Sequence, residues 1–449
     1  MPPDKRALLK QRLANGEMNL HPLTFPQREL WEASPVLAAD IANHICCFIE
    51  VRGAITAGNC QAAIQRVVQR QEALRISFLP GKDRPVQMIR KDSPASFRSR
   101  ELSSVQRTPE AVEELAQEIF REPFDLVQGP LYRVELLSRA ADDHVLAFAI
   151  HHAIADGWTL GVFVQDLVVA YLQGLRGVRE ALPPVPLSYT AWGAAERAFW
   201  QPAELARRAA FWKKNLAGSG RLWSELEGSE TASGAHQRMV SYFPAELADA
   251  ARELARRNGA TLFSTLLTAF QIALAEWTGG EDIVVGTPVA NRSKEAVRET
   301  MGYFAGIVPL RAKVDRDRPF AASLRAVHEM TVDAFANAMP FAEMVQALGD
   351  AQSPGHNPAF EVRFALQNHP IPDVTLPGLS AKLRMRSTGT ARFHLACEIT
   401  EEGGRLEVVW LFRPNLFPSE EIENLGRMFE AVLAGAGRLP ESRLAALKT

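Results

Sequence analysis

The strongest constraint on the fold is an apolar run that ends in two histidines and a tight turn. Residues 145–150 (VLAFAI) are continuously apolar, which is typical of a short strand buried on both faces. The segment His151-His152-Ala153-Ile154-Ala155-Asp156-Gly157-Trp158 follows, and residues 160–171 then show the apolar spacing of a helix. Two histidines therefore lie where a central strand ends, and an Asp-Gly turn lies where a helix begins. Sites in α/β folds commonly occupy such strand ends.

The two histidines cannot have the same role. Successive side chains of a strand point to opposite faces, so one imidazole can face a channel while the other packs inward and braces the turn. A neutral histidine can accept a proton near pH 7, because the reference pKa of the side chain is about 6.5. Two satisfied structural histidines followed by an Asp N-cap are the simpler alternative. The adjacency of His151 and His152, with Asp156 and Gly157 at fixed distances after them, favours a catalytic site.

The pattern His-His-x-x-x-Asp-Gly-Trp resembles the signature of condensation domains of nonribosomal peptide synthetases, within the chloramphenicol-acetyltransferase-like superfamily. Further blocks of that family follow the expected order over nearly the whole chain. These are residues 70–75 with Gln71 in place of the usual His, residues 285–292 with Gly-Thr-Pro-x-Ala-Asn-Arg, residues 302–311 with Gly306-Ile307 in place of Asn-Thr, Pro340-Phe341, and Asn357-Pro358 followed by residues 364–368.

The resemblance implies an α+β fold of two chloramphenicol-acetyltransferase-like lobes, arranged as a V-shaped pseudo-dimer with a tunnel between them. We expect an N-terminal lobe at residues 1–181, which carries the histidine motif, and a C-terminal lobe at residues 182–449, with a segment that crosses over to the first lobe. The proline-rich residues 182–186 support this boundary, because proline interrupts helices.

Sequence patterns predict the same mixture of elements. Apolar runs and alternation predict strands at residues 45–51, 86–89, 131–137, 145–150, 237–243, 283–285, 362–366, 393–399 and 406–412. Helical periodicity predicts helices at residues 60–76, 109–120, 244–257, 262–277, 321–336 and 419–433.

The resemblance also assigns roles at the motif. His152 would face the tunnel and either take a proton from the nucleophile or hold it in place. The backbone N–H of Gly157 is the candidate donor to the oxyanion of the transition state.

Four further residues would support the site, and one would contact the substrate. Asp156 would point away from the tunnel and pair with Arg75 or Arg292, and this pair, together with His151, would brace the loop. Trp158 is a candidate substrate contact, with a place in the core as the alternative.

The implied reaction transfers an acyl group from the phosphopantetheine thioester of an acyl or peptidyl carrier protein to an amine or a hydroxyl. The product would be an amide or ester in nonribosomal peptide or hybrid polyketide antibiotic biosynthesis. No cofactor would bind directly, since the carrier protein supplies the phosphopantetheine arm, and the nucleophile would be a small molecule or carrier-bound. A free-standing acyltransferase that uses coenzyme A thioesters is one alternative, and an epimerising or non-catalytic relative is another. The changes at Gln71 and at Gly306-Ile307 suggest an unusual pair of substrates.

Composition restricts the partners and the location. A net charge of −2 gives no sign of nucleic-acid binding, and no apolar run approaches the roughly 20 residues of a membrane span. The N-terminus lacks an apolar signal core. The four cysteines and the remaining histidines lack metal-ligand spacing, so we expect reduced cysteines and no metal site. These features predict a cytoplasmic protein without nucleic-acid or membrane partners, and we expect a monomer.

Overall fold

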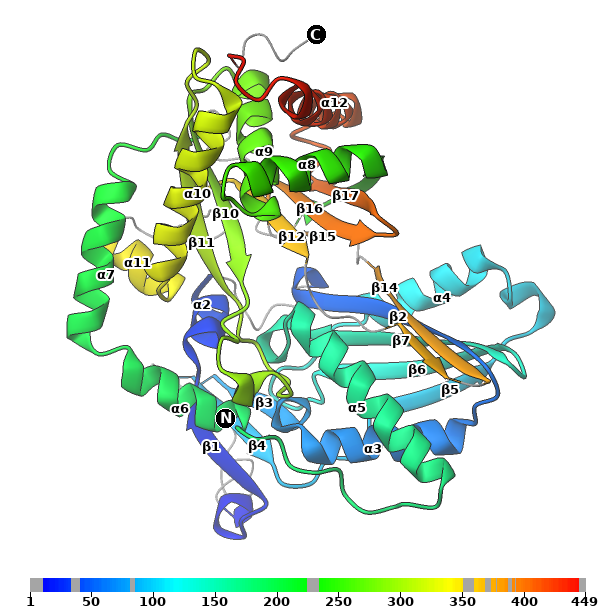
Figure 1. The fold of residues 1–449 in the computed structure, drawn as a ribbon. Coiled ribbons are helices and arrows are strands. Elements are labelled where there is room, and N and C mark those ends of the chain that lie inside the picture. Colours follow the sequence, from blue (N-terminus) through cyan, green and yellow to red (C-terminus); the bar gives the residue numbers. More distant parts are fainter. Residues whose placement is uncertain are drawn as a thin grey trace. The chain divides into compact units, whose positions relative to one another are not determined.

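The computed structural model describes residues 11–33, 41–80, 85–223, 234–349, 359–367, 373–376, 378–386, 390–391 and 393–443. The chain divides into two compact units (Figure 1). The first unit comprises Met1–Trp200, Ala290–Ala305 and His369–Thr388, and the second comprises Gln201–Val289, Gly306–Asn368 and Gly389–Thr449. Each unit combines helices with a mixed sheet, so the expected α+β class with two lobes is confirmed.

The main sheet of the first unit has six described strands in the order β13-β14-β2-β7-β6-β5. Only β5 and β6 pair in parallel among them. Strand β7 lies between β2 and β6, and its residues after Asp143 are buried, which explains the continuous apolar run of residues 145–150. The strands are β2 (His44–Arg52), β5 (Phe97–Glu101), β6 (Tyr132–Ala140), β7 (Asp143–His151), β13 (Val374–Leu376) and β14 (Leu379–Arg386).

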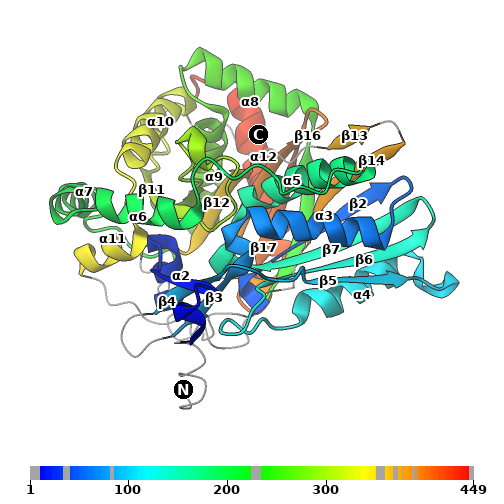
Figure 2. The same ribbon diagram turned by 90° about the horizontal axis from the view of Figure 1, so that it is seen from below.

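Helices cover both faces of this sheet (Figure 2). Helices α3 (Ala57–Arg70) and α5 (Gly157–Leu175) pack side by side on one face, where the rings of Phe148 and Phe163 stack with centroids 4.2 Å apart. Helix α4 (Pro109–Arg121) covers the other face, where Phe120 packs against Phe48. Two apolar clusters therefore bury β7 from both sides of the sheet.

By length and composition alone, α5 would qualify as a membrane span, and so would the bent pair of α8 (Ala245–Arg257) and α9 (Leu262–Thr278). In α5 the apolar residues are interrupted by polar ones, which is why the sequence shows no continuous apolar run of that length. Its apolar side chains belong to the core of the first unit, since 56% of the apolar window is buried within the fold.

The first unit extends beyond the predicted boundary at residue 181. It runs to Trp200 because α6 (Tyr189–Phe199) packs on it: Tyr189 and Trp192 are buried against Phe304. The remaining elements of this unit are β1 (Met18–Pro22), α2 (Phe25–Ala33), β3 (Ile76–Leu79) and β4 (Val86–Arg90), of which the strands form a small sheet in the order β1-β4-β3.

Helix α3 is shorter than the predicted helix at residues 60–76. It ends at Arg70, because Gln71 has extended backbone angles and its side chain is held by other elements. A short 3₁₀ turn, Glu72–Arg75, then leads into β3.

The second unit contains a sheet of six described strands in the order β11-β10-β12-β16-β17-β9. Helix α9 is almost entirely buried, and α8, α10 and α12 pack against it or one another. The elements not yet given are α7 (Pro202–Asn215), β8 (Gly234–Ala235), β9 (Gln237–Phe243), β10 (Asp282–Val289), β11 (Gly306–Lys313), α10 (Phe320–Ala336), α11 (Phe341–Leu348), β12 (Val362–Gln367), β15 (Thr390–Ala391), β16 (Leu395–Glu402), β17 (Arg405–Phe412) and α12 (Ser419–Arg438). Strands β8 and β15 pair separately.

Candidate active site

His151 is the last residue of β7 and is a structural element of the turn. Its side chain is only 4% exposed, and its Nδ1 accepts the N–H of Ala153 at 3.1 Å. Because Nδ1 accepts this bond, the proton of the neutral ring is on Nε2. The rings of His44 and Phe124 lie against it, with centroids 6.0 and 6.2 Å away. His151 therefore packs inward, as the alternation of side chains along a strand requires.

His152 begins the short 3₁₀ turn that joins β7 to α5. The side chain of His152 is only partly buried, whereas those of its neighbours His151 and Ala153 are buried. The ring of Tyr303 packs against the imidazole with centroids 4.5 Å apart and an interplanar angle of 70°. Thus the strand end presents one partly accessible imidazole, which is the chemical requirement for a general base or a positioning group.

Asp156 is the N-cap of α5 and is buried, with 4% of its surface exposed. Its Oδ1 accepts the Thr159 N–H at 3.0 Å and lies 3.0 Å from the Thr159 hydroxyl. The same hydroxyl accepts the Asp156 N–H at 3.3 Å, so Asp156 and Thr159 form a reciprocal capping box. Oδ2 accepts the N–H of Phe304 at 3.1 Å. Its bonds to Thr159 and Phe304 therefore direct the carboxylate into the protein.

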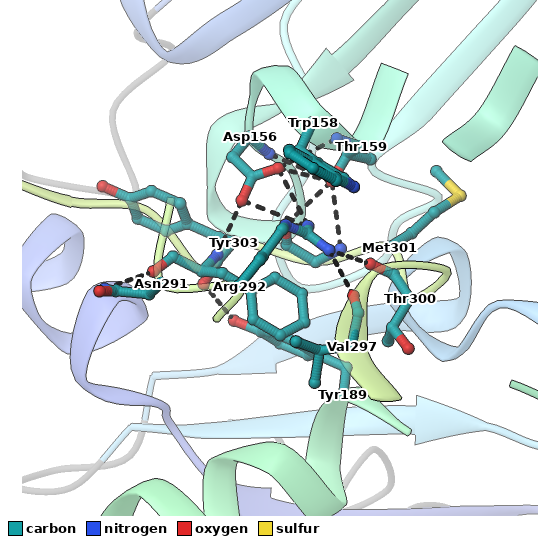
Figure 3. A network of polar contacts seen from close by, with 12 residues as sticks. Asp156, Trp158, Thr159, Tyr189, Asn291, Arg292, Val297, Thr300, Met301 and Tyr303 are labelled. Carbon is teal, nitrogen blue, oxygen red and sulfur yellow. Dashed lines mark hydrogen bonds and ion pairs between the residues drawn. The ribbon is translucent and has the colours of Figure 1, made fainter. Parts of the chain in front are cut away.

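The cation that pairs with Asp156 is Arg292 (Figure 3). Its Nη2 lies 3.1 and 3.3 Å from the two carboxylate oxygens, and Nη1 donates to the carbonyls of Val297 and Thr300 at 2.8 and 2.7 Å. The guanidinium also lies over the Phe304 ring, 3.9 Å from its centroid. Burial lowers the pKa of Arg292, and the carboxylate of Asp156 opposes that shift. The positive charge of the buried Arg292 side chain is therefore stabilised by one carboxylate and by backbone carbonyls rather than by solvent.

Arg75, the other arginine considered for Asp156, lies in a different network. It donates to the carbonyls of Val68, Arg90 and Lys91, and so joins the end of α3 to the end of β4. Its position five residues beyond α3 directs it toward these carbonyls. The expectation that Arg75 pairs with Asp156 is therefore replaced by the pair with Arg292.

Residues 290–305 supply much of the site, although sequence patterns indicate only separate motifs there. Asn291 has a φ of 51°, a conformation that Asn tolerates better than most residues, and its amide donates to the Phe304 carbonyl at 2.9 Å. Gly302 exchanges hydrogen bonds with the Thr159 hydroxyl at 3.2 and 2.9 Å. A Cβ at Gly302 would collide with the ring of Tyr189. This segment is therefore bound to α5 and α6 by its backbone as well as by Arg292.

Gln71 attaches the same segment to α3 and α5. Its Nε2 donates to Asp166 Oδ2 at 2.7 Å and to the carbonyl of Glu299 at 2.9 Å, and its Oε1 accepts the N–H of Met301 at 2.9 Å. Arg70 adds ion pairs with Asp166 and Glu299. Burial raises the pKa of Asp166, while the bonds from Gln71 and Arg70 lower it. Since Gln71 is fully buried, its hydrogen bonds fix residues 290–305 against α3 and α5, and its side chain does not reach a substrate.

Gly157 and Trp158 form the first turn of α5. The N–H groups of a first helical turn have no acceptor within the helix. The Gly157 amide belongs to this class of groups and is therefore a candidate oxyanion donor. Trp158 is half-buried against the core, and its Nε1–H donates to the Arg298 carbonyl at 2.9 Å. The only N–H donor of the indole is therefore occupied by an intramolecular hydrogen bond. Substrate contact by Trp158 stays a prediction.

Three residues of this site have no role predicted from the sequence: Thr159, Tyr189 and Tyr303, the last of which lies within the block at residues 302–311. Thr159 stands three residues after Asp156, the spacing of a capping box, and could have been identified from that pattern. The hydroxyl of Tyr189 donates to the Tyr303 carbonyl at 2.9 Å and bonds to Thr24 at 2.9 Å, and burial raises the pKa of Tyr189 well above its usual value. No local sequence pattern predicts that a tyrosine such as Tyr189 will be buried and hydrogen-bonded at this position.

The other family blocks lie elsewhere or outside the described residues. Gly306 and Ile307 begin β11 and pair with Val289 and Pro288 of β10 in the second unit. Asn357, Pro358 and Asn368 fall outside the residues that the structure describes.

A family model described as "Condensation domain" matches residues 18–449. The chain is 29% identical, over 434 residues, to chondramide synthase cmdD of Chondromyces crocatus. That alignment covers 94% of this chain and only 11% of the synthase. The chain therefore spans a small part of this much longer relative.

Two solved structures have the same fold. The condensation domain from Monacolin K polyketide synthase MokA has a TM-score of 0.80 at 19% identity, with 95% of this chain and 99% of that one covered. A mutant of the starter condensation domain of rhizomide synthetase RzmA, in complex with C8-CoA, has a TM-score of 0.82 at 19% identity, with 95% and 97% covered. At 19% identity, these two structures show only that the fold is similar. The family model, in contrast, matches the sequence itself, over residues of both units.

Proposed function

Because this chain belongs to the condensation-domain family, we propose that it is an acyltransferase that joins an acyl group to an amine or hydroxyl nucleophile. The acyl group arrives as a thioester on the phosphopantetheine arm of an acyl or peptidyl carrier protein. The nucleophile is a small molecule or is itself carrier-bound, and the product is an amide or ester of a nonribosomal peptide or hybrid polyketide. The names of the chondramide synthase and polyketide synthase relatives support this class of product.

The observation that carries the proposal is the placement of His152. His152 is only partly buried at the end of the central strand β7, whereas the neighbouring His151 is buried and its Nδ1 accepts a backbone N–H of the turn. In the proposed reaction the nucleophile attacks the thioester carbonyl and forms the new C–N or C–O bond. The C–S bond then breaks and the sulfur leaves as a thiolate. His152 either takes the proton of the nucleophile and passes it to this thiolate, or holds the nucleophile in place while that proton moves to the departing sulfur, and the free thiol is released. General acid–base catalysis of this kind contributes about 10² to 10⁴ in rate.

The developing oxyanion requires fixed donors, and we assign the backbone N–H of Gly157 to this role. The geometry that supports this is the cap of α5: Asp156 fixes the first turn through Thr159, and Arg292 fixes Asp156. In this proposal Asp156, Arg292 and His151 position the loop and take no part in the chemistry.

The test of His152 uses two substitutions and a defined assay. Acyl transfer to a panel of amines and alcohols is followed by mass spectrometry for the wild type, His152→Ala and His152→Asn. We expect His152→Ala to reduce turnover by at least about 10²-fold, with an unchanged melting temperature. If His152→Asn retains most of the activity, the imidazole positions the nucleophile. If both variants fail equally, it acts as the base. Wild-type turnover in His152→Ala would contradict the assignment.

A second candidate donor is a coenzyme A thioester, which the C8-CoA complex of the RzmA structure supports. One acyl group is therefore presented on holo-carrier protein, on coenzyme A and on a short pantetheine mimic. Binding energy from remote parts of a substrate is used to position the reacting atoms, so the carrier-bound donor should have the highest kcat as well as kcat/KM. Equal kcat/KM with free coenzyme A thioester would favour the free-standing acyltransferase. Absence of product with every donor would favour an epimerising or non-catalytic relative.

A further inference from the structure

The ring of Tyr303, a residue of the block at residues 302–311, packs against the imidazole of His152. Its ring lies 4.5 Å from the imidazole at an angle of 70°, and only 6% of the residue is exposed. Offset and edge-to-face arrangements of this kind are the favoured geometry of aromatic pairs. The contact thus restricts the rotation of the imidazole at the place where it leaves the strand.

The backbone on both sides of Tyr303 is fixed by bonds to other elements. On one side, Gly302 is bonded to Thr159 of α5. On the other, the Phe304 N–H donates to Asp156. The Tyr303 carbonyl itself accepts the Tyr189 hydroxyl at 2.9 Å. Its main chain is therefore held at three successive residues.

The same residues bind the backbone of Tyr303 and the start of α5. Asp156 caps α5 and accepts the Phe304 N–H, and Thr159 bonds to both Asp156 and Gly302. Figure 3 shows Tyr303 beside this network, with its phenol ring directed away from Arg292. The ring of Tyr303 consequently has a fixed position relative to the turn that carries His152.

We propose that Tyr303 is a positioning residue: its ring holds the imidazole of His152 in the orientation used for acyl transfer. The aromatic ring is sufficient for this role, and the phenol hydroxyl is not required. Because Tyr303 acts through His152, its removal lowers kcat and leaves the KM of donor and nucleophile unchanged. This inference rests on the proposed function for its kinetic effect, but the ring contact itself can be measured without turnover.

The kinetic test compares Tyr303→Phe, Tyr303→Leu and Tyr303→Met, with Tyr242→Leu as the matched control. Tyr242 is half-exposed on β9 of the second unit, so its loss reports the general effect of removing a tyrosine ring. We expect Tyr303→Leu and Tyr303→Met to lose about 5- to 10-fold in kcat, the scale of one aromatic contact. Tyr303→Phe should remain within about 2-fold of the wild type, and so should Tyr242→Leu. A loss of kcat in Tyr303→Phe equal to that in Tyr303→Leu would overturn the proposal.

A double-mutant cycle separates positioning from a general structural role. In a His152→Ala background, Tyr303→Leu should cause no further loss of the residual turnover, because the ring it orients is absent. An equal loss in both backgrounds would show that Tyr303 acts independently of His152 and would overturn the proposal.

The third measurement does not depend on activity. In protein labelled with ¹³C at histidine rings, the His152 signal is assigned by its disappearance in His152→Ala. A nearby aromatic ring shifts this signal, so it should move in Tyr303→Leu and Tyr303→Met and keep its place in Tyr303→Phe. An unmoved signal in Tyr303→Leu would refute the contact. If the signal moves but no donor is turned over by the wild type, the proposed function fails while the ring contact stands.

Discussion

Replacing Asp156 with Ala should destabilise the first unit strongly, because it removes the partner of a buried cation. The carboxylate accepts bonds from Thr159, Arg292 and Phe304, and the side chains of Asp156 and Arg292 are 5% and 1% exposed. Breaking one side of a buried ion pair costs on the order of 3–5 kcal/mol, and loss of an N-cap adds about 1 kcal/mol. The carbonyls of Val297 and Thr300 still accept from Arg292 and offset part of this cost.

The assay is differential scanning calorimetry at pH 7, with Asp249→Ala as the control. A loss of about 3–5 kcal/mol corresponds to a fall of roughly 6–20 °C in melting temperature for a unit of this size. Asp249 forms an ion pair with Arg252 at 76% exposure on the second unit, so its replacement should change the melting temperature very little. The double variant Asp156→Asn with Arg292→Leu should be less destabilised than the sum of its single variants, because no lone buried charge remains.

One result would refute this reasoning. If Asp156→Ala loses turnover but melts like the wild type, the buried pair does not stabilise the fold, and Asp156 belongs to the chemistry instead. A melting temperature that falls in Asp156→Ala but not in Arg292→Leu would show that the helix cap, rather than the ion pair, carries the effect.

Substitutions at three further positions, Glu196, Asn291 and Gly302, test the surroundings of the site. Burial raises the pKa of Glu196 from 4.5 to about 7, so its cost to folding is absent below pH 4.5, grows between these values and is complete above pH 7. Melting curves of Glu196→Gln should therefore match the wild type at about pH 4 and lie above it at about pH 8, and a constant difference over this range would contradict the pKa. Asn291→Ala should lose about 1–2 kcal/mol in urea unfolding because of its positive φ, whereas Asn291→Gly should lose less. Gly302→Ala should lower the melting temperature by collision with Tyr189, and Tyr189→Leu in the same chain should restore part of it.

Local patterns predict the elements that depend on neighbouring residues. The strand at residues 145–150, the helix after Asp156 and the strand at residues 237–243 all occur, because burial and capping act within a few residues. The choice between Arg75 and Arg292 could not be made locally. Both lie in family blocks, and only the packing of residues 290–305 brings Arg292 to Asp156.

Longer-range features are beyond the reach of sequence patterns. Strand β14, which pairs with β2, alternates too weakly to be recognised, and its partner lies more than 300 positions earlier in the chain. The proline-rich run before Tyr189 and Trp192 predicts a place in the second lobe for both, yet their burial against Phe304 places α6 in the first unit. The chain's expected V-shaped arrangement and tunnel stay predictions.

Residues 290–305 connect the paired strands β10 and β11, so they are made late in synthesis although they complete the first unit. When a ribosome has produced only residues 1–200, Asp156 has no Arg292, His152 has no Tyr303, and β2 has no β14 at its edge. The first unit consequently cannot reach its final state until residues 290–305 and strand β14, which ends at Arg386, have been made. Contacts between such distant positions slow folding and leave the partly made unit exposed to aggregation. A fragment cut after Trp200 would contain both histidines of the motif and still lack the interior of the site.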